Sequence, residues 1–303
     1  MLRAQAEDYL ALRRTLGFRL DRAARRLRAF VKFATAQGDT HVRASTAVAW
    51  AAEAPSPAAR HVRLRTIWRL ARFLHAEDPA HEIPPATLFP APTRRRLPYI
   101  YAPEELAALV AAAGRLRTTY PLRRQVYATL LGLLAATGLR VSEALDLRLG
   151  DVLPDGILQI RRTKFGKSRL IPLHPTVVAA LRRYLATRSR QAIPDDHVFI
   201  SAGHRRIASS TMHDTFHRVL RLAGIAPDQH PRPRIHDLRH TVATRALQQC
   251  ATRRETVARH VVALATYLGH ADIADTYWYL EATPELLADM AAAAEALVAK
   301  EAA

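Results

Sequence analysis

The ten residues Ile235-His-Asp-Leu-Arg-His-Thr-Val-Ala-Thr244 combine two histidines and an arginine with apolar residues at helical spacing. If this stretch is a helix, His236, Arg239 and His240 share one face and the apolar side chains occupy another. The helix would then carry a proton carrier beside a cation that suits an anion. Two other interpretations of this segment remain open. It could be an ordinary helix start without a catalytic role. His236 and Asp237 could also be a pair of metal ligands, which would need further His and Asp ligands.

The segment Thr137-Gly-Leu-Arg-Val-Ser-Glu143 lies upstream, after a strongly apolar stretch from Leu122 to Ala136. Gly138 can end the preceding helix in a left-handed turn. In a new helix, Arg140 and Glu143 would lie three residues apart on one face, where the carboxylate can hold the guanidinium in place. The planar fork of N–H donors then suits a phosphate. A plain surface ion pair is the alternative.

Residues 157–173, ILQIRRTKFGKSRLIPL, are typical of a β-hairpin, with apolar residues on both sides of a Lys-Phe-Gly-Lys turn. Lys164 opens that turn, and the turn holds two of the only four lysines in a chain that otherwise uses arginine. An ammonium can release a proton near neutral pH when its surroundings lower its pKa, whereas a guanidinium cannot. Lys164 is therefore a candidate general acid, with a solvated turn lysine as the alternative.

The fourth reactive segment is Leu268-Gly-His270, which is followed nine residues later by Tyr279 within Asp275-Thr-Tyr-Trp-Tyr-Leu280. Tyrosine is a weak nucleophile because its pKa is about 10. It becomes useful where cations stabilise the developing charge and a base takes its proton. The alternative is that the Tyr-Trp-Tyr run is a set of core aromatics.

Helical spacing of apolar residues runs from Ala6 to about Asp78, and a proline-rich segment with the basic run Arg94-Arg-Arg96 follows it. Beyond this linker, Pro103-Glu-Glu is typical of a helix start, because proline and acids suit a helix N-terminus. The pattern predicts a mainly α protein with one small β-sheet. We expect two domains, a helical one at residues 1–93 and a second at residues 94–303.

The chain has 303 residues, a formal net charge of +18 and a pI of about 11.0. A protein this basic usually binds a polyanion, which is nucleic acid or an anionic membrane. The longest apolar run, Val126 to Leu139, has 14 residues, fewer than the roughly 20 that span a bilayer. The N-terminus lacks an apolar signal core, and a single cysteine, Cys250, excludes an intrachain disulfide and a cysteine-based zinc site. We therefore expect a cytoplasmic protein that binds nucleic acid.

In this order, the four segments resemble those of the tyrosine recombinase (phage integrase) family. That family has an Arg in a Thr-Gly-Leu-Arg-x-x-Glu segment, a Lys on a β-hairpin, a His-x-Leu-Arg-His helix, a Leu-Gly-His and a nucleophilic Tyr. The matching residues, in chain order, are Arg140, Lys164, His236, Arg239, His270 and Tyr279, with Glu143 as the supporting acid. The region 1–93 is similar to the family's helical core-binding (SAM-like) domain, which binds DNA, so residues 94–303 would be the catalytic domain.

Three features depart from the family pattern. The stretch before His270 is longer, with a basic insert around Thr252-Arg-Arg-Glu-Thr256. Val242 stands where a phenylalanine is common in the family. The Tyr-Trp-Tyr run also offers Tyr277 as a second candidate nucleophile, although the spacing from His270 favours Tyr279.

The resemblance implies a transesterification that needs no metal ion and no other cofactor. Tyr279 would attack the scissile phosphate, forming a 3′-phosphotyrosyl link and releasing a 5′-hydroxyl. The resemblance also gives each remaining residue a role. Arg140 and Arg239 would stabilise the phosphate, with Glu143 orienting Arg140. Lys164 would protonate the leaving oxygen, His236 would accept the tyrosine proton, and His270 would donate a hydrogen bond to a phosphate oxygen.

The implied partner is double-stranded DNA, bound between two basic domains by a homotetramer, with or without partner recombinases. An alanine-rich helix expected at residues 284–300 would pack on a neighbouring protomer or within its own domain. Tyr-Trp-Tyr-Leu280, followed by Thr-Pro-Glu-Leu-Leu287, is most similar to recombinases carried by bacterial transposable elements. Two other interpretations remain open. One is a non-catalytic DNA-binding accessory protein on the same fold, and the other is a type IB topoisomerase.

Overall fold

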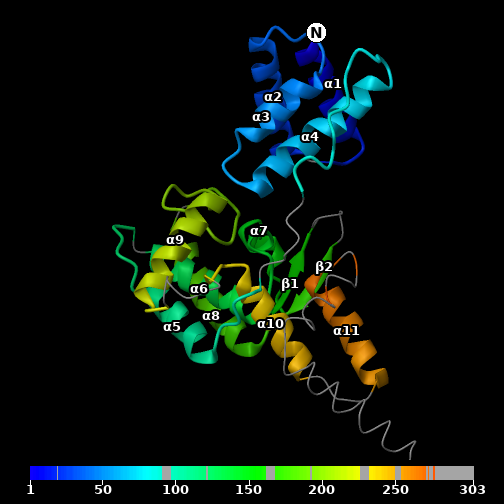
Figure 1. Cartoon of the computed structure of the whole chain (residues 1–303). Coiled ribbons are helices and arrows are strands. Elements are labelled where there is room, and N and C mark those ends of the chain that lie inside the picture. The colour runs from blue at the N-terminus through cyan, green and yellow to red at the C-terminus, as the bar shows by residue number, and fades with distance from the viewer. Residues whose placement is uncertain are drawn as a thin grey trace, which may run out of the picture. The chain divides into compact units, whose positions relative to one another are not determined.

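The fold comes from a computed structural model, which describes residues 1–18, 20–90, 97–120, 122–161, 168–191, 193–225, 232–249, 254–270, 272 and 276. The chain divides into two compact units, Met1–Arg95 and Arg96–Ala303 (Figure 1). Each unit has its own cluster of buried apolar side chains. Each can therefore be stabilised by its own core.

The described part of the N-terminal unit consists of four helices, α1 (Leu2–Thr15), α2 (Asp21–Ala36), α3 (Ala44–Ala52) and α4 (Pro57–His75). The predicted helical region therefore begins four residues before Ala6. Helix α4 starts where proline and serine favour a start, because Pro57 is its first residue and the Ser56 hydroxyl accepts the Ala59 N–H at 3.3 Å. Helices α2 and α4 contact each other and both α1 and α3, so they form the centre of this unit.

The described part of the C-terminal unit is mainly helical with one two-stranded sheet, as predicted. The helix start predicted at Pro103 is confirmed, and the apolar stretch that begins at Leu122 is a helix from that residue on. In chain order the elements are α5 (Pro103–Gly114), α6 (Leu122–Thr137), α7 (Val141–Leu145), the 3-10 helix η1 (Leu149–Asp151), β1 (Ile157–Ile160), β2 (Arg169–Pro172), α8 (Pro175–Ser189), α9 (Ser209–Leu222), α10 (Asp237–Gln248) and α11 (Arg254–Leu268).

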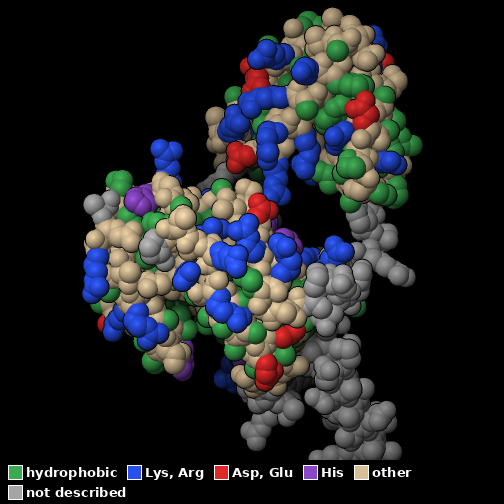
Figure 2. Space-filling model, turned by 90° about the vertical axis from the view of Figure 1, so that its left-hand side faces the viewer, with side chains coloured by type: hydrophobic (Ala, Val, Ile, Leu, Met, Phe, Trp, Pro, Cys, Tyr) green, Lys and Arg blue, Asp and Glu red, His purple; other side chains and the backbone are tan. Residues whose placement is uncertain are grey.

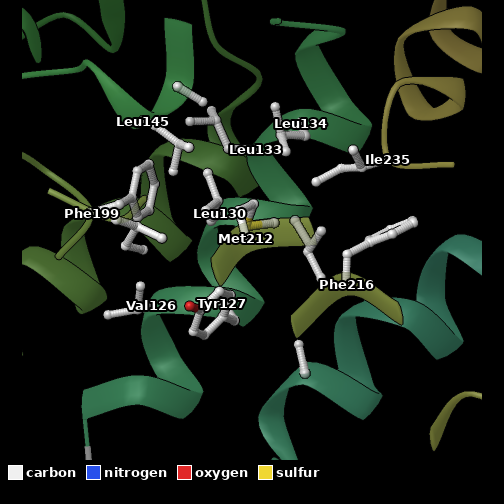
Figure 3. Packing of buried hydrophobic residues seen from close by; sticks show 14 of the residues in the cluster. Val126, Tyr127, Leu130, Leu133, Leu134, Leu145, Phe199, Met212, Phe216 and Ile235 are labelled. Carbon is white, nitrogen blue, oxygen red and sulfur yellow. The ribbon is translucent and has the colours of Figure 1, made fainter. Parts of the chain in front are cut away.

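Helix α6 forms the centre of the C-terminal unit, because it contacts α5, α8 and α10. Its buried side chains recur every three or four residues and include Leu130 and Leu134. Figure 3 shows both in one cluster with Met212 and Ile235, which come from much later in the chain. This core holds the C-terminal end of α6 firmly, and the Gly138 turn follows directly from that end.

Strands β1 and β2 form the predicted hairpin, an antiparallel pair in which Ile160 lies opposite Arg169. Side chains alternate along a strand, so Arg169 lies on the same face of β2 as Ile171, which is fully buried. Helix α11 contacts β2 near its C-terminal end, where the Tyr267 carbonyl accepts a hydrogen bond from Arg169 (Figure 1). The predicted turn, with Lys164, lies outside the described residues.

Candidate active site

Arg140 follows a sharp turn at the end of α6. Gly138 has a φ of +62°, and its N–H donates to the Leu134 carbonyl at 3.0 Å, so the helix ends in the predicted left-handed turn. Arg140 then has an extended backbone (φ −64°, ψ 141°) and precedes α7. This corrects the expectation that Arg140 lies inside a helix beside Glu143. Because Glu143 is the third residue of α7, its carboxylate reaches back to the residue that caps the helix.

Glu143 holds Arg140 at two points. Its Oε2 accepts the backbone N–H of Arg140 at 3.0 Å, and its Oε1 accepts Nη1–H at 2.8 Å. The Glu143 side chain is 6% exposed and the Arg140 side chain is 26% exposed, so the two do not form a solvated surface ion pair. Burial alone would raise the pKa of Glu143, but hydrogen bonds from Arg169 and Arg140 and the charge of Arg169 hold that pKa below its ordinary value. Glu143 is therefore ionised at neutral pH and fixes the guanidinium of a side chain that stays partly exposed.

Arg239, on α10, connects two separate segments of the site. Its Nη1 donates to the Gly138 carbonyl at 2.9 Å, and its Nη2 donates to the Leu268 carbonyl at 2.7 Å. The residue is only 2% exposed. Charged donors form stronger hydrogen bonds than neutral ones, especially away from water. Arg239 therefore ties the turn before Arg140 to the end of α11.

The Leu-Gly-His segment completes the described part of the site. The Gly269 carbonyl accepts Arg140 Nη2–H at 2.9 Å. His270 follows directly, and its Nδ1 lies 2.7 Å from the hydroxyl oxygen of Thr276, which is fully buried. Arg140, Glu143, Arg239 and His270, four of the residues predicted from the sequence, are thus brought together through backbone carbonyls of Gly138, Leu268 and Gly269.

His236 lies immediately before α10, and its ring contacts that of His240 edge to face at 4.8 Å between centroids. Burial lowers the pKa of His236, and the nearby charge of Arg239 lowers it further. Burial and the neighbouring His236 lower the pKa of His240 to about 3. Both rings are therefore uncharged at neutral pH. A neutral His236 has the lone pair that a proton acceptor needs.

Asp237 serves the start of α10. Its Oδ2 accepts the backbone N–H of Arg234 at 2.8 Å, and its Oδ1 accepts Arg234 Nη2–H at 2.8 Å. The Asp237 side chain is 1% exposed. Both oxygens are thus engaged in holding the helix start, which argues against the interpretation of His236-Asp237 as a metal pair.

Two other groups in the described residues have the composition of a metal site, His41-Asp78-His81 and Asp195-Asp196-His197. In the first, His81 Nδ1 accepts the backbone N–H of Val42 at 3.0 Å. The other ring nitrogen, Nε2, lies 3.2 Å from the side-chain amide nitrogen of Gln5 and 4.0 Å from Asp78 Oδ2. In the second, Asp195 accepts the backbone N–H of His197 at 2.8 Å and Asp196 pairs with Arg148. Both groups are explained as hydrogen-bonded links within their units.

Lys164, Tyr277 and Tyr279 lie outside the described residues, as does the helix expected at residues 284–300. Their roles stay predictions. Arg169, which contacts Glu143 from β2, also belongs to the site and was not among the predicted residues. A signal for it exists in the strand pattern. Arg169 lies two residues before the apolar Ile171, so a charged side chain on the inner face of the hairpin requires an acidic partner.

Gly138 permits a close approach that a larger residue would prevent. A Cβ at this position would lie 3.2 Å from the Cβ of Val242 and 3.3 Å from Leu268 Cδ2. We expect Gly138→Ala to lower the free energy of unfolding by about 2 to 4 kcal/mol, from the left-handed backbone and the overpacking together. Urea titration measures this loss. Gly224→Ala is the matched control, because Gly224 has a φ of +70° and no atom within 4 Å of an added Cβ. An equal loss in the two variants would contradict the packing argument.

The sequence profile of the Phage integrase family matches residues 101–285, a range that includes every predicted site residue. The Sinorhizobium fredii protein y4rB is 38% identical over 297 residues, which cover 94% of this chain and 94% of y4rB. Tyrosine recombinase XerD of Caulobacter vibrioides is 31% identical over 238 residues, which cover 77% of this chain and 73% of XerD.

Among solved structures, a lambda integrase tetramer bound to a Holliday junction matches with a TM-score of 0.64 and 17% identity. The match covers 92% of this chain and 76% of the integrase chain. At this level of identity the match concerns the fold.

Proposed function

The chain belongs to the phage integrase family of tyrosine recombinases, and we propose that it is a site-specific recombinase that cleaves and rejoins DNA through a bond between Tyr279 and a 3′-phosphate. One observation carries the proposal. Arg140 is oriented by an ionised Glu143 and by the Gly269 carbonyl, and its side chain is still 26% exposed. A guanidinium prepositioned on such a side chain is suited to a phosphate that gains negative charge during a reaction.

The proposed reaction exchanges one phosphodiester bond for another. The Tyr279 oxygen attacks phosphorus, the bond between phosphorus and the 5′-oxygen breaks, and a 3′-phosphotyrosyl bond remains. His236 accepts the tyrosine proton, and Lys164 gives a proton to the leaving 5′-oxygen. The 5′-hydroxyl of a second strand then attacks the phosphotyrosyl bond and releases Tyr279. The number of phosphoester bonds is conserved, so the exchange needs no energy source.

The two arginines differ in their surroundings and therefore in their proposed contributions. Two hydrogen bonds to Glu143 and Gly269 occupy two of the five N–H groups that the Arg140 guanidinium offers, so others can reach a phosphate oxygen directly. Arg239 is almost fully buried and bonds two carbonyls. We propose that it adds positive charge beneath the phosphate and keeps the carbonyls of Gly138 and Leu268 turned away from the phosphate. His270, fixed by Thr276, supplies a hydrogen bond to a non-bridging oxygen.

The proposed partner is double-stranded DNA, bound by both units, with residues 1–93 as the core-binding domain and residues 94–303 as the catalytic domain. Basic side chains are spread over the face of each unit that Figure 2 shows, with few acidic ones between them. On α4, Arg65 and Arg72 lie over the ring of Trp68 at 4.5 and 4.8 Å. Such a basic helix face suits backbone phosphates.

We also propose a homotetramer on DNA, with or without partner recombinases, and a gene carried by a transposable element. The lambda integrase structure is a tetramer on a Holliday junction, which supports the first proposal. The proposal of a transposable element is supported by the sequence from Tyr277 to Leu287, which is similar to that of recombinases carried by such elements. A DNA substrate in a bacterial cell also implies a cytoplasmic protein. None of the helices in the described residues is long and apolar enough to span a lipid bilayer.

A plasmid assay in EDTA tests the proposed function. The substrate is a supercoiled plasmid with two copies of the DNA that flanks the gene, and the control plasmid lacks this DNA. We expect a covalent protein–DNA adduct and exchange between the two copies, with no change in the control plasmid. Relaxation of the control plasmid without exchange would indicate a type IB topoisomerase. Binding without any adduct would indicate a non-catalytic accessory protein.

A further inference from the structure

We infer that Arg169 is a positioning residue for the proposed cleavage reaction. It fixes Glu143, and through Glu143 the guanidinium of Arg140, and it joins the hairpin of Lys164 to the loop of His270. The inference rests on the proposed function, because it concerns the geometry of the same site. None of the predicted catalytic roles includes this residue.

Arg169 binds Glu143 with both branches of its guanidinium. Nη2 donates to Oε2 at 2.7 Å, and Nη1 donates to Oε1 at 3.1 Å. The remaining nitrogen, Nε, donates to the Tyr267 carbonyl at 2.8 Å. All three nitrogens thus have acceptors, and the side chain is 10% exposed. A lysine could not bridge the same acceptors, because an ammonium is a single point of donors.

Gly269 completes a closed ring of contacts. A Cβ added to Gly269 would lie 2.7 Å from Arg169 Nη1 and 2.9 Å from its Cζ, so the guanidinium packs directly on the glycine backbone. The carbonyl of this glycine accepts Arg140 Nη2–H. The ring therefore runs from Arg169 to Glu143, then to Arg140, to Gly269 and back to Arg169. A shift in any member displaces the Arg140 guanidinium.

The position of Arg169 in the hairpin gives the ring a second consequence. Arg169 is the first residue of β2, five residues after Lys164. At the other end of the turn, Arg161 pairs with the buried Asp151. Both strand ends are thus anchored. Only the Arg169 anchor leads to Glu143, and it therefore sets the position of the hairpin relative to Arg140.

A purely structural ion pair is the alternative to a positioning role, since breaking a buried pair is destabilising in itself. The two roles differ in what happens to Glu143. Arg169 from β2 and Arg140 from the start of α7 face its carboxylate, and Arg239 and His270 lie on the neighbouring segments. Burial raises the pKa of Glu143, and the hydrogen bonds and charge of Arg169 lower it. Without Arg169 the pKa of Glu143 therefore rises. Glu143 then takes up a proton at a higher pH and releases Arg140.

The test measures adduct formation on a nicked DNA substrate across a pH series. We expect Arg169→Gln to reduce the rate at neutral pH by about a hundredfold, as a displacement of about 1 Å does. The acid limb of the rate profile should also move to higher pH, while DNA affinity stays that of the wild type. Arg169→Lys keeps the charge but not the two-point bridge, so it should lower the rate and move the acid limb less than Arg169→Gln does. If Arg169→Gln does not fold, the Arg169→Lys variant still tests the inference.

Arg188→Gln is the matched control. Arg188 is also buried and donates to a backbone carbonyl, that of Asp195 at 2.5 Å, but it contacts none of the site residues in the described structure. We expect it to lower the melting temperature without changing the pH profile. A pH-independent loss of rate in Arg169→Gln, or wild-type rates in both Arg169 variants, would overturn the inference. An inactive wild-type protein would instead overturn the proposed function.

Discussion

Tyr279→Phe is expected to abolish the covalent protein–DNA adduct. Phenylalanine keeps the ring but lacks the oxygen that forms the bond to phosphorus, so the rate should fall by a factor on the order of 10⁶, below detection, as for other lost nucleophiles. DNA affinity should stay close to that of the wild type, because phosphate contacts of basic residues supply most of it. The measurement uses a nicked, labelled duplex with the flanking DNA of the gene. A denaturing gel then separates the adduct from free DNA.

Tyr277→Phe is the matched control, because it removes the same hydroxyl two residues earlier in the same Tyr-Trp-Tyr run. We expect it to form the adduct at nearly the wild-type rate. The opposite pattern, an adduct in Tyr279→Phe and none in Tyr277→Phe, would move the nucleophile to Tyr277. Adducts in both single variants would show that neither tyrosine is required alone.

The parts of the site that could be predicted from the sequence depend on interactions between near neighbours. A glycine after an apolar helix favours a left-handed turn, and an acid three residues after Arg140 reaches back to it. Both features are present in the structure. The hairpin and the starts of α5 and α6 were predictable for the same reason. Two backbone positions differ: Arg140 caps α7 and does not lie within it, and His236 lies just before α10.

The parts that could not be predicted depend on residues far apart in the chain. Arg239 binds the carbonyl of Gly138, and Arg140 binds that of Gly269. Side-chain type and spacing carry no information about which backbone carbonyl an arginine meets. Arg169 also differs from the predicted residues, because its partner Glu143 is 26 residues away and already has a nearer arginine. Spacing along the chain therefore predicts one partner for Glu143, Arg140. The packing of β2 adds a second partner, Arg169.

Lys164→Ala is expected to reduce cleavage of ordinary DNA by a factor of about 10² to 10⁴, the usual contribution of a general acid. The reason is the leaving 5′-oxygen, which needs a proton as its bond to phosphorus breaks. A 5′-bridging phosphorothiolate has a sulfur leaving group that needs no proton. The variant should therefore cleave the phosphorothiolate substrate at nearly the wild-type rate. Adduct formation on the two substrates, measured in parallel, gives the comparison.

Lys167→Ala is the matched control, because Lys167 belongs to the same predicted turn and loses the same charge. Its effect should be small and equal on both substrates. The two substrates also separate Lys164 from Arg169. Arg169 acts through the position of Arg140, and a better leaving group does not restore that position, so Arg169→Gln should stay impaired on the phosphorothiolate. If Lys164→Ala is equally impaired on both substrates, Lys164 is a phosphate contact and the leaving oxygen takes its proton from another group.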